Sequence, residues 1–101
     1  MSRDGYEIDG PHGPIRIERH ALAGLVVTAA ELVEGARVRR PRRGLDVSVA
    51  EGKAKVELEL AARYGTALPS VGREVQTNVV AALLGSAELV ATVDVSIEEL
   101  D

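Results

Sequence analysis

The stretch from residue 54 to residue 84 constrains the fold most, because its hydrophobic period changes once. Up to residue 64, apolar positions alternate with polar ones; the apolar ones are Ala54, Val56, Leu58, Leu60, Ala62 and Tyr64. A period of two predicts a strand with one buried and one exposed face. Beyond Pro69 the apolar positions recur every four residues, at Val71, Val75, Val79 and Leu83. This spacing predicts an amphipathic helix, so a half-exposed strand leads directly into a helix.

Shorter patterns on both sides predict further elements. Ile15 and Ile17 indicate a short first strand, and the apolar spacing from Arg19 onward predicts a helix that ends at Gly35, where glycine can take the left-handed closing conformation. Residues 45–49 alternate as a strand, and Glu51-Gly52 supplies a turn that folds the next strand back antiparallel. A break at Gly85 and Ser86 precedes a last alternating strand over residues 89–97.

The resulting order is β-α-β-β-α-β, which predicts the α+β class. We expect a two-layer sandwich with a mostly antiparallel four-stranded sheet and two helices on one face. A chain of 101 residues supports one core. Residues 1–12 are interpreted as a flexible lead-in and residues 13–101 as a single domain. The other sheet face is predicted to be exposed and acidic, lined by Asp46, Ser48, Glu57, Glu59, Thr92, Asp94, Ser96 and Glu98.

Composition limits the cellular compartments that are expected for the chain and the residue types that can form its core. The chain has no Cys, Phe or Trp, so the core must be aliphatic and neither disulfides nor thiolate chemistry are available. The N-terminal residues lack the apolar run of a secretory signal. The most apolar run, residues 21–30, is about half of the roughly 20 residues that a membrane-spanning helix needs. We therefore expect a cytoplasmic protein whose membrane contact, if any, is peripheral and made through a partner.

Basic residues are concentrated in one short segment. Arg37, Arg39, Arg40, Arg42 and Arg43 are five of the twelve basic residues, which leaves seven basic against sixteen acidic residues elsewhere, a balance of −9. The cluster is interpreted in three ways: as a solubilising loop, as a contact to an acidic protein surface such as that of a second copy, or as a site for nucleic acid or anionic lipid. The sheet lacks stacking aromatics and carries acids, so we do not expect it to bind RNA.

Candidate catalytic groups are few. Glu57 and Glu59 lie on one strand face and could approach Asp94 across the sheet, yet their polar surroundings indicate solvated carboxylates and not an acid–base pair. His12 and His20 are eight residues apart and have no ligand spacing that predicts a metal site. We therefore expect no enzymatic activity, no cofactor and no metal. The predicted interaction residues are Arg37, Arg39, Arg40, Arg42, Arg43, Glu57, Glu59 and Asp94.

Several segments, in order and spacing, resemble a known family. They are Gly13-Pro-Ile-Arg-Ile, an Ala-rich helix closing in Val33-Glu34-Gly35, and Gly44-Leu-Asp-Val-Ser-Val. A Val-Glu-Leu-Glu-Leu strand then runs into Tyr64-Gly65, Leu68-Pro69-Ser-Val and Arg73-Glu74-Val75-Gln76, and Val93-Asp-Val-Ser-Ile closes the series. Over residues 13–101 the chain resembles the bacterial alkaline shock protein family, also called the envelope stress response family.

The resemblance implies a function without catalysis. Members are small cytoplasmic proteins of envelope or alkaline stress, several are held at the membrane by a separate anchoring protein, and they tend to self-associate. The family has no established catalytic residues. The resemblance therefore implies an interaction or scaffold protein of envelope homeostasis, either a homo-oligomer or a chain docked on a membrane-anchored partner. The segment Arg37–Arg43 is more basic than in many members, so the alternative is a module that binds nucleic acid or anionic lipid through it.

Overall fold

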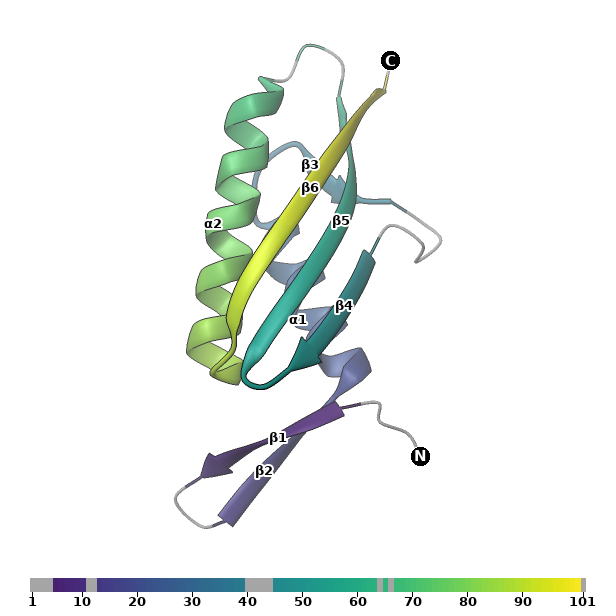
Figure 1. The fold of residues 1–101 in the computed structure, drawn as a ribbon. Helices are drawn as coiled ribbons and strands as arrows, with labels where there is room; N and C mark the ends of the chain where they lie inside the picture. Colours follow the sequence, from purple (N-terminus) through teal and green to yellow (C-terminus); the bar gives the residue numbers. More distant parts are fainter. Residues whose placement is uncertain (1–4, 11–12, 40–44, 64, 66, 101) are drawn as a thin grey trace.

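The computed structural model describes residues 5–10, 13–39, 45–63, 65 and 67–100 (Figure 1). Along the chain the elements are β1 (Gly5–Gly10), β2 (Gly13–Glu18), α1 (Arg19–Glu31), β3 (Ala36–Val38), β4 (Leu45–Ala50), β5 (Lys53–Arg63), α2 (Leu68–Ala87) and β6 (Val90–Leu100).

The main sheet is built around β5. On one side β5 pairs antiparallel with two strands, with β4 along its first half and with the short β3 near its end. On the other side it pairs in parallel with β6 along its whole length, from Lys53 opposite Val90 to Arg63 opposite Leu100. The helix α2 connects β5 to β6, because parallel neighbours cannot be joined by a tight turn.

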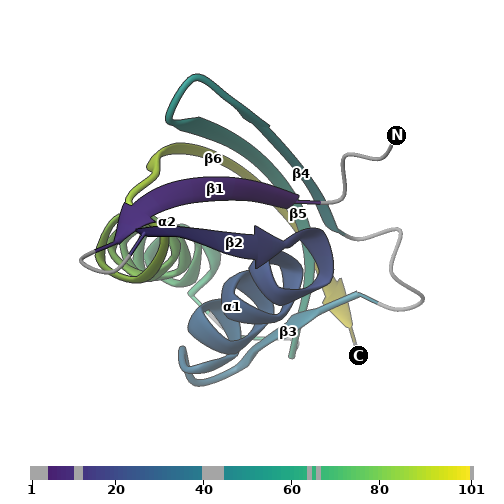
Figure 2. The same ribbon diagram turned by 90° about the horizontal axis from the view of Figure 1, so that it is seen from below.

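Both helices lie against one face of the sheet (Figure 2). The buried positions of β5 are Ala54, Val56, Leu58, Leu60 and Ala62, and those of α2 are Val71, Val75, Val79, Leu83 and Ala87. Both sets match the alternating and four-residue spacings of the sequence. The predicted α+β class, the two helices and the four-stranded, mostly antiparallel sheet are confirmed. The core between the layers is aliphatic throughout the described residues.

The predicted Glu51-Gly52 turn is also confirmed. Both residues have positive φ, 53° and 77°, which is the requirement of a two-residue hairpin turn of type I′. Because β4 ends at Ala50 and β5 begins at Lys53, the loop contains only these two residues. The turn therefore fixes the register in which the polar faces of β4 and β5 meet.

Two predictions about strands are wrong. The lead-in of residues 1–12 contains the strand β1, which pairs antiparallel with β2 in a separate two-stranded hairpin. The first predicted strand, Ile15 to Ile17, therefore lies outside the main sheet, and the fourth strand of that sheet is β3. In the hairpin Tyr6 is opposite Ile17 and Ile8 is opposite Ile15. The alternation of Tyr6 and Ile8 therefore indicated the strand β1, but the neighbouring glycines favoured a loop in the sequence-based interpretation.

The ends of both helices differ from prediction. The α1 helix ends at Glu31, and Gly35, with φ of 88°, instead lies in the turn that leads to β3. The α2 helix continues through Gly85 and Ser86 to Ala87, after which Glu88 adopts the left-handed conformation with φ of 57°. Gly85 is tolerated inside the helix because a single glycine costs only about 1 kcal/mol there.

Gly24 is not explained by close packing. An added Cβ at this position would meet no other atom within 4 Å, although Gly24 lies in the middle of α1. We therefore expect Gly24→Ala to raise the free energy of unfolding by about 0.5–1 kcal/mol through helix propensity. Urea unfolding of both proteins measures the difference, and an unchanged or lowered midpoint would show that the glycine is needed for another reason.

Candidate interaction surface

The face of the main sheet that points away from the helices is here called the outer face. It is formed by the exposed side chains that alternate with the core positions of each strand. Its charged and polar members are Arg37, Arg39, Asp46, Ser48, Lys53, Lys55, Glu57, Glu59, Arg63, Thr92, Asp94, Ser96 and Glu98. The eight residues predicted to line this face are all on it.

Three carboxylates occupy one row across the outer face. Asp46 of β4 is opposite Glu57 of β5, and Glu57 is opposite Asp94 of β6. Glu59 lies on the same face two residues further along β5, beside Ser96. These four acids line an open depression of about 310 Å³ together with Ser96. The structure therefore brings Glu57, Glu59 and Asp94 together on one face, and all three side chains are exposed.

Basic residues lie on both sides of this acidic row. Lys53 and Lys55 occupy the start of β5, beside Val90 and Thr92 of β6. At the other end Arg37 is opposite Ala61. The sequence-based description of this face as acidic was incomplete, because its list of residues omitted Lys53, Lys55 and Arg37. The outer face is thus banded, with an acidic centre between two ends that carry basic residues.

Arg39 connects two strands across the outer face. Its backbone N–H donates to the carbonyl oxygen of Glu59 over 2.9 Å, which extends the pairing of β3 with β5. Its guanidinium forms an ion pair with the carboxylate of Glu98 on β6. The side chain of Ala61 is small, so it leaves room for this ion pair to pass over β5. Both side chains are about half exposed, so the pair contributes at most about 1 kcal/mol to stability.

The predicted arginine cluster is only partly described. Arg37 and Arg39 are exposed on the outer face. Arg40, Arg42 and Arg43 lie outside the described residues, as does His12. The structure therefore joins two of the five arginines to the acidic surface predicted as a separate contact region. Sequence reasoning missed this connection because β3, with only three residues, is too short to show an alternating pattern.

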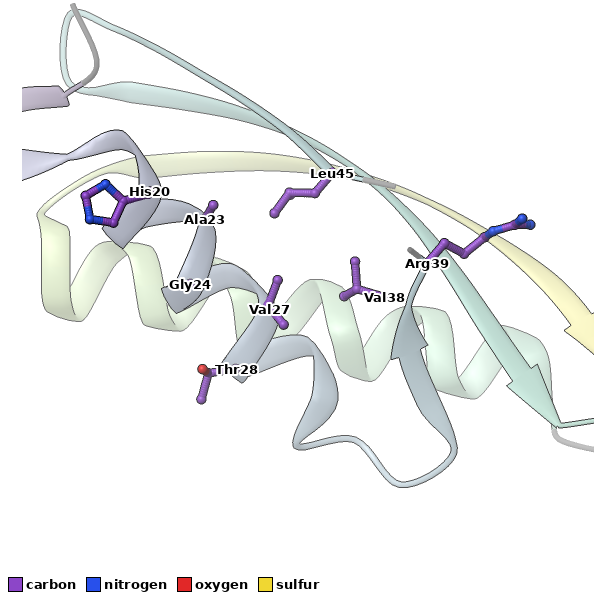
Figure 3. Close-up of a pocket in the computed structure, with 8 residues that line it drawn as sticks. All are labelled: His20, Ala23, Gly24, Val27, Thr28, Val38, Arg39 and Leu45. Carbon is purple, nitrogen blue, oxygen red and sulfur yellow. The ribbon is translucent and has the colours of Figure 1, made fainter. Parts of the chain in front are cut away.

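A second hollow lies on the helix side of the sheet (Figure 3). It has a volume of about 450 Å³ and lies between α1, the end of β3 and the start of β4. Ala23 and Val27 of α1, with Val38 and Leu45, form its apolar part, and His20 lies at one end. The Arg39 side chain extends away from it in Figure 3. Among the described residues no carboxylate lines this hollow, and most of its lining is apolar.

Two other kinds of site are absent from the described part of the chain. Within the described part of the chain, no group of three or more His, Cys, Asp or Glu side chains could hold a metal ion. None of the described helices has both the length and the hydropathy of a membrane-crossing segment.

Like charges opposite each other on neighbouring strands destabilise a sheet. We therefore expect Glu57→Lys, which places a cation between Asp46 and Asp94, to raise the free energy of unfolding by about 0.5–1 kcal/mol. Chemical denaturation at low and high salt measures the change, and the gain should shrink at high salt. Glu74→Lys, the same charge change on the exposed side of α2, is the control and should have a smaller effect.

The solved structures that share this architecture include C-terminal domains of MamM. A variant in its zinc form is 20% identical, with a TM-score of 0.57 over 81% of this chain and 86% of that one. Another variant is 22% identical, with a TM-score of 0.56 over 81% of this chain and 96% of that one. A variant in its cadmium form is 23% identical, with a TM-score of 0.55 over 81% and 96%. At these identities the likeness shows the fold alone.

A comparison with curated proteins finds no match. A family model described by a cell envelope-related function, that of the alkaline shock proteins, matches residues 20–101. The match covers α1, the whole main sheet and α2, and it leaves out the β1–β2 hairpin. The chain therefore belongs to the alkaline shock protein family, whose function is related to the cell envelope.

Proposed function

We propose that this chain is a non-enzymatic interaction module of the cell envelope, which self-associates and docks on a membrane-anchored partner from the cytoplasmic side. The observation that carries the proposal is the banded outer face. In its acidic centre Glu57 lies directly opposite Asp94, which brings like charges together, an arrangement unfavourable for folding alone. A surface that gives up stability in this way is suited to a partner that carries positive charge, because charge complementarity guides association and selects the partner.

The geometry of the carboxylates supports binding over catalysis. General acid–base chemistry requires two carboxyl groups whose surroundings separate their pKa values. Glu57, Glu59 and Asp94 instead share one exposed face and line an open depression. The other hollow, the recess beside α1, is lined by His20, Arg39, Thr28 and apolar residues. The acids and the recess therefore lie on opposite faces of the sheet.

The alternative function is binding of nucleic acid or anionic lipid through Arg37–Arg43. Arg39 already pairs with Glu98, so a phosphate would have to compete with a carboxylate for it. Arg37 lies on the same face as four acidic side chains, which repel phosphate. Both observations favour an acidic or mixed protein surface as the partner of these arginines.

The test is capture of membrane proteins from envelope fractions of the native cell. The bait is the full chain, compared with Glu57→Lys plus Asp94→Lys on the outer face and with Glu74→Lys plus Glu88→Lys as a control of equal charge on the helix side. A specific membrane protein retained by the wild type and the control, and lost with the outer-face variant, is the expected result. Equal retention by all three baits would contradict the proposal.

A parallel assay separates the alternative. Binding of the purified chain to RNA and to vesicles with anionic lipid is measured at low and physiological salt. The proposal predicts no binding above that of the Arg37→Glu variant. Salt-sensitive binding that this substitution abolishes would instead establish the nucleic-acid or lipid function.

A further inference from the structure

One long strand edge of the main sheet is open. β6 extends from Val90 to Leu100, and β5 is its sole partner among the described strands. Eleven residues correspond to about 36 Å of strand, twice the common length. A long edge presents a row of backbone donors and acceptors, and such a row pairs readily with another strand.

The direction of the backbone groups along β6 follows from two hydrogen bonds. The N–H of Val90 donates to the carbonyl oxygen of Gly52 over 3.1 Å, so even-numbered residues point their backbone groups toward β5. The carbonyl oxygen of Val93 accepts from Nε2 of Gln76 over 2.8 Å, which shows that odd-numbered residues point outward. The edge therefore consists of the outward N–H and C=O groups of Ala91, Val93, Val95, Ile97 and Glu99. The Val93 carbonyl already accepts from Gln76 and has one further lone pair for a second strand.

From this edge we infer that two copies of the chain pair antiparallel through β6, with the two-fold axis at Val95. The inference rests on the self-association part of the proposed function and names its surface. An axis at Val95 pairs all eleven residues of each strand. It puts Asp94 opposite Ser96 of the second copy, Thr92 opposite Glu98 and Ala91 opposite Glu99. Every acid on β6 then has a neutral residue directly opposite.

The neighbouring registers are less favourable. Moving the axis by one residue to Asp94 places this carboxylate against its own copy. Moving it to Ser96 places Asp94 against Glu98 of the second copy. Both positions also place an even-numbered residue at the axis. The backbone groups of even-numbered residues point toward β5, so they cannot bond to the second copy. The Val95 axis is thus selected by charge and by backbone direction together.

The flanking residues support a second copy as the occupant. Antiparallel pairing brings the Glu98 end of one strand beside Thr92 of the other, and Thr92 is next to Lys55 on β5. Lys55 and Glu98 of the second copy then lie on the same outer face with only the strand of Thr92 between them. Val80 and Leu84 follow Gln76 at four-residue spacing on α2, so they flank the same edge, and they are 37% and 55% exposed. The pairing would shield apolar surface as well as backbone.

A dimer of this kind has a consequence for docking. The two main sheets become one continuous sheet, and their outer faces lie side by side on the same surface. Each docking site of a membrane-anchored partner would then be presented twice, and bivalent binding raises the apparent affinity without new contacts.

The test is the dimer dissociation constant of the full chain, measured by sedimentation equilibrium. Ser96→Glu places a glutamate opposite Asp94 of the second copy at two symmetric positions, so we expect dimerisation to weaken by about tenfold or more. Ser48→Glu is the control, because it is the same substitution at an exposed outer-face serine on the other side of β5, and it should stay within about twofold of the wild type. Asp94→Lys combined with Ser96→Glu creates two opposite-charge pairs and should restore the dimer.

Hydrogen exchange supplies a readout that is independent of these variants. Amides of Val93, Val95 and Ile97 should become protected as protein concentration rises through the dissociation constant. A dimer unaffected by Ser96→Glu, or protection that does not change with concentration, would overturn the β6 inference while leaving self-association intact. A wild-type chain that remains monomeric at millimolar concentration would overturn both, and docking on the membrane partner would then be judged by the capture experiment alone.

Discussion

Leu60→Ala is expected to lower the free energy of unfolding by about 2–5 kcal/mol. Leu60 lies at the middle of β5, is fully buried, and ranks among the largest enclosed side chains of the core. The substitution removes buried apolar surface and leaves a cavity that the two helices and the sheet cannot fully close. Domains of this size have total stabilities of about 5–15 kcal/mol, so the loss is a large fraction of the whole.

Urea denaturation followed by circular dichroism measures this effect. Leu32→Ala is the matched control, because it is the same substitution at a leucine that is 75% exposed. The control should cost well under half as much. Equal losses at the two positions would show that burial, as described for the core, does not determine their contributions.

Glu57→Pro is expected to cost about 1–3 kcal/mol for the hydrogen-bond partner that it leaves unsatisfied, although the Glu57 side chain is exposed. The bond from the Arg39 N–H to the Glu59 carbonyl shows that odd-numbered residues of β5 point their backbone groups toward β3 and β4. Proline at position 57 therefore removes the N–H that pairs with β4 opposite Asp46. It does so in the central strand, where proline is rarely tolerated.

Glu57→Ala separates the backbone effect from the side-chain effect. It removes the same carboxylate and keeps the N–H, so it should be close to neutral or slightly stabilising. This agrees with the stabilisation predicted above for Glu57→Lys. Thermal unfolding of the pair gives the difference directly. If the proline variant melted together with the alanine variant, the assigned pairing of β4 with β5 would be wrong.

Long periodic segments made most of the fold predictable. The alternation in β5 and the four-residue spacing in α2 each continue over many positions, so isolated exceptions do not hide the period. The two-residue turn at Glu51-Gly52 was predictable because positive φ at both positions restricts the sequence strongly, and glycine occupies one of them.

The missed elements are short or lack a clear pattern. The three residues of β3 cannot display a period, and its place in the sheet depends on pairing with residues 60–62, far along the chain. The β1–β2 hairpin contains prolines and glycines that favour an irregular interpretation, although Tyr6 and Ile8 alternate. The helical state of Gly85 and Ser86 reflects tertiary packing, since Leu83 and Ala87 on either side are buried.

The candidate surface was predicted as two separate regions, an acidic face and an arginine segment. Alternation alone assigned Glu57, Glu59 and Asp94 to one face. Their arrangement in a single row with Asp46 required the register between strands, which a one-dimensional pattern does not contain. The same register brings Arg39 to Glu98, 59 positions later in the chain.

The parallel pairing of β5 with β6 also affects the order in which the protein folds. Lys53 pairs with Val90, 37 positions further along, and the same separation applies to every pair in this ladder. The β4–β5 hairpin closes through a two-residue turn, so it loses much less chain entropy when it forms. We therefore expect the hairpin to form early and β6 to join late, after α2 has packed against the sheet. Until that step the edge of β5 that will receive β6 is unpaired, and slow folding at high concentration would favour exchange of β6 between chains.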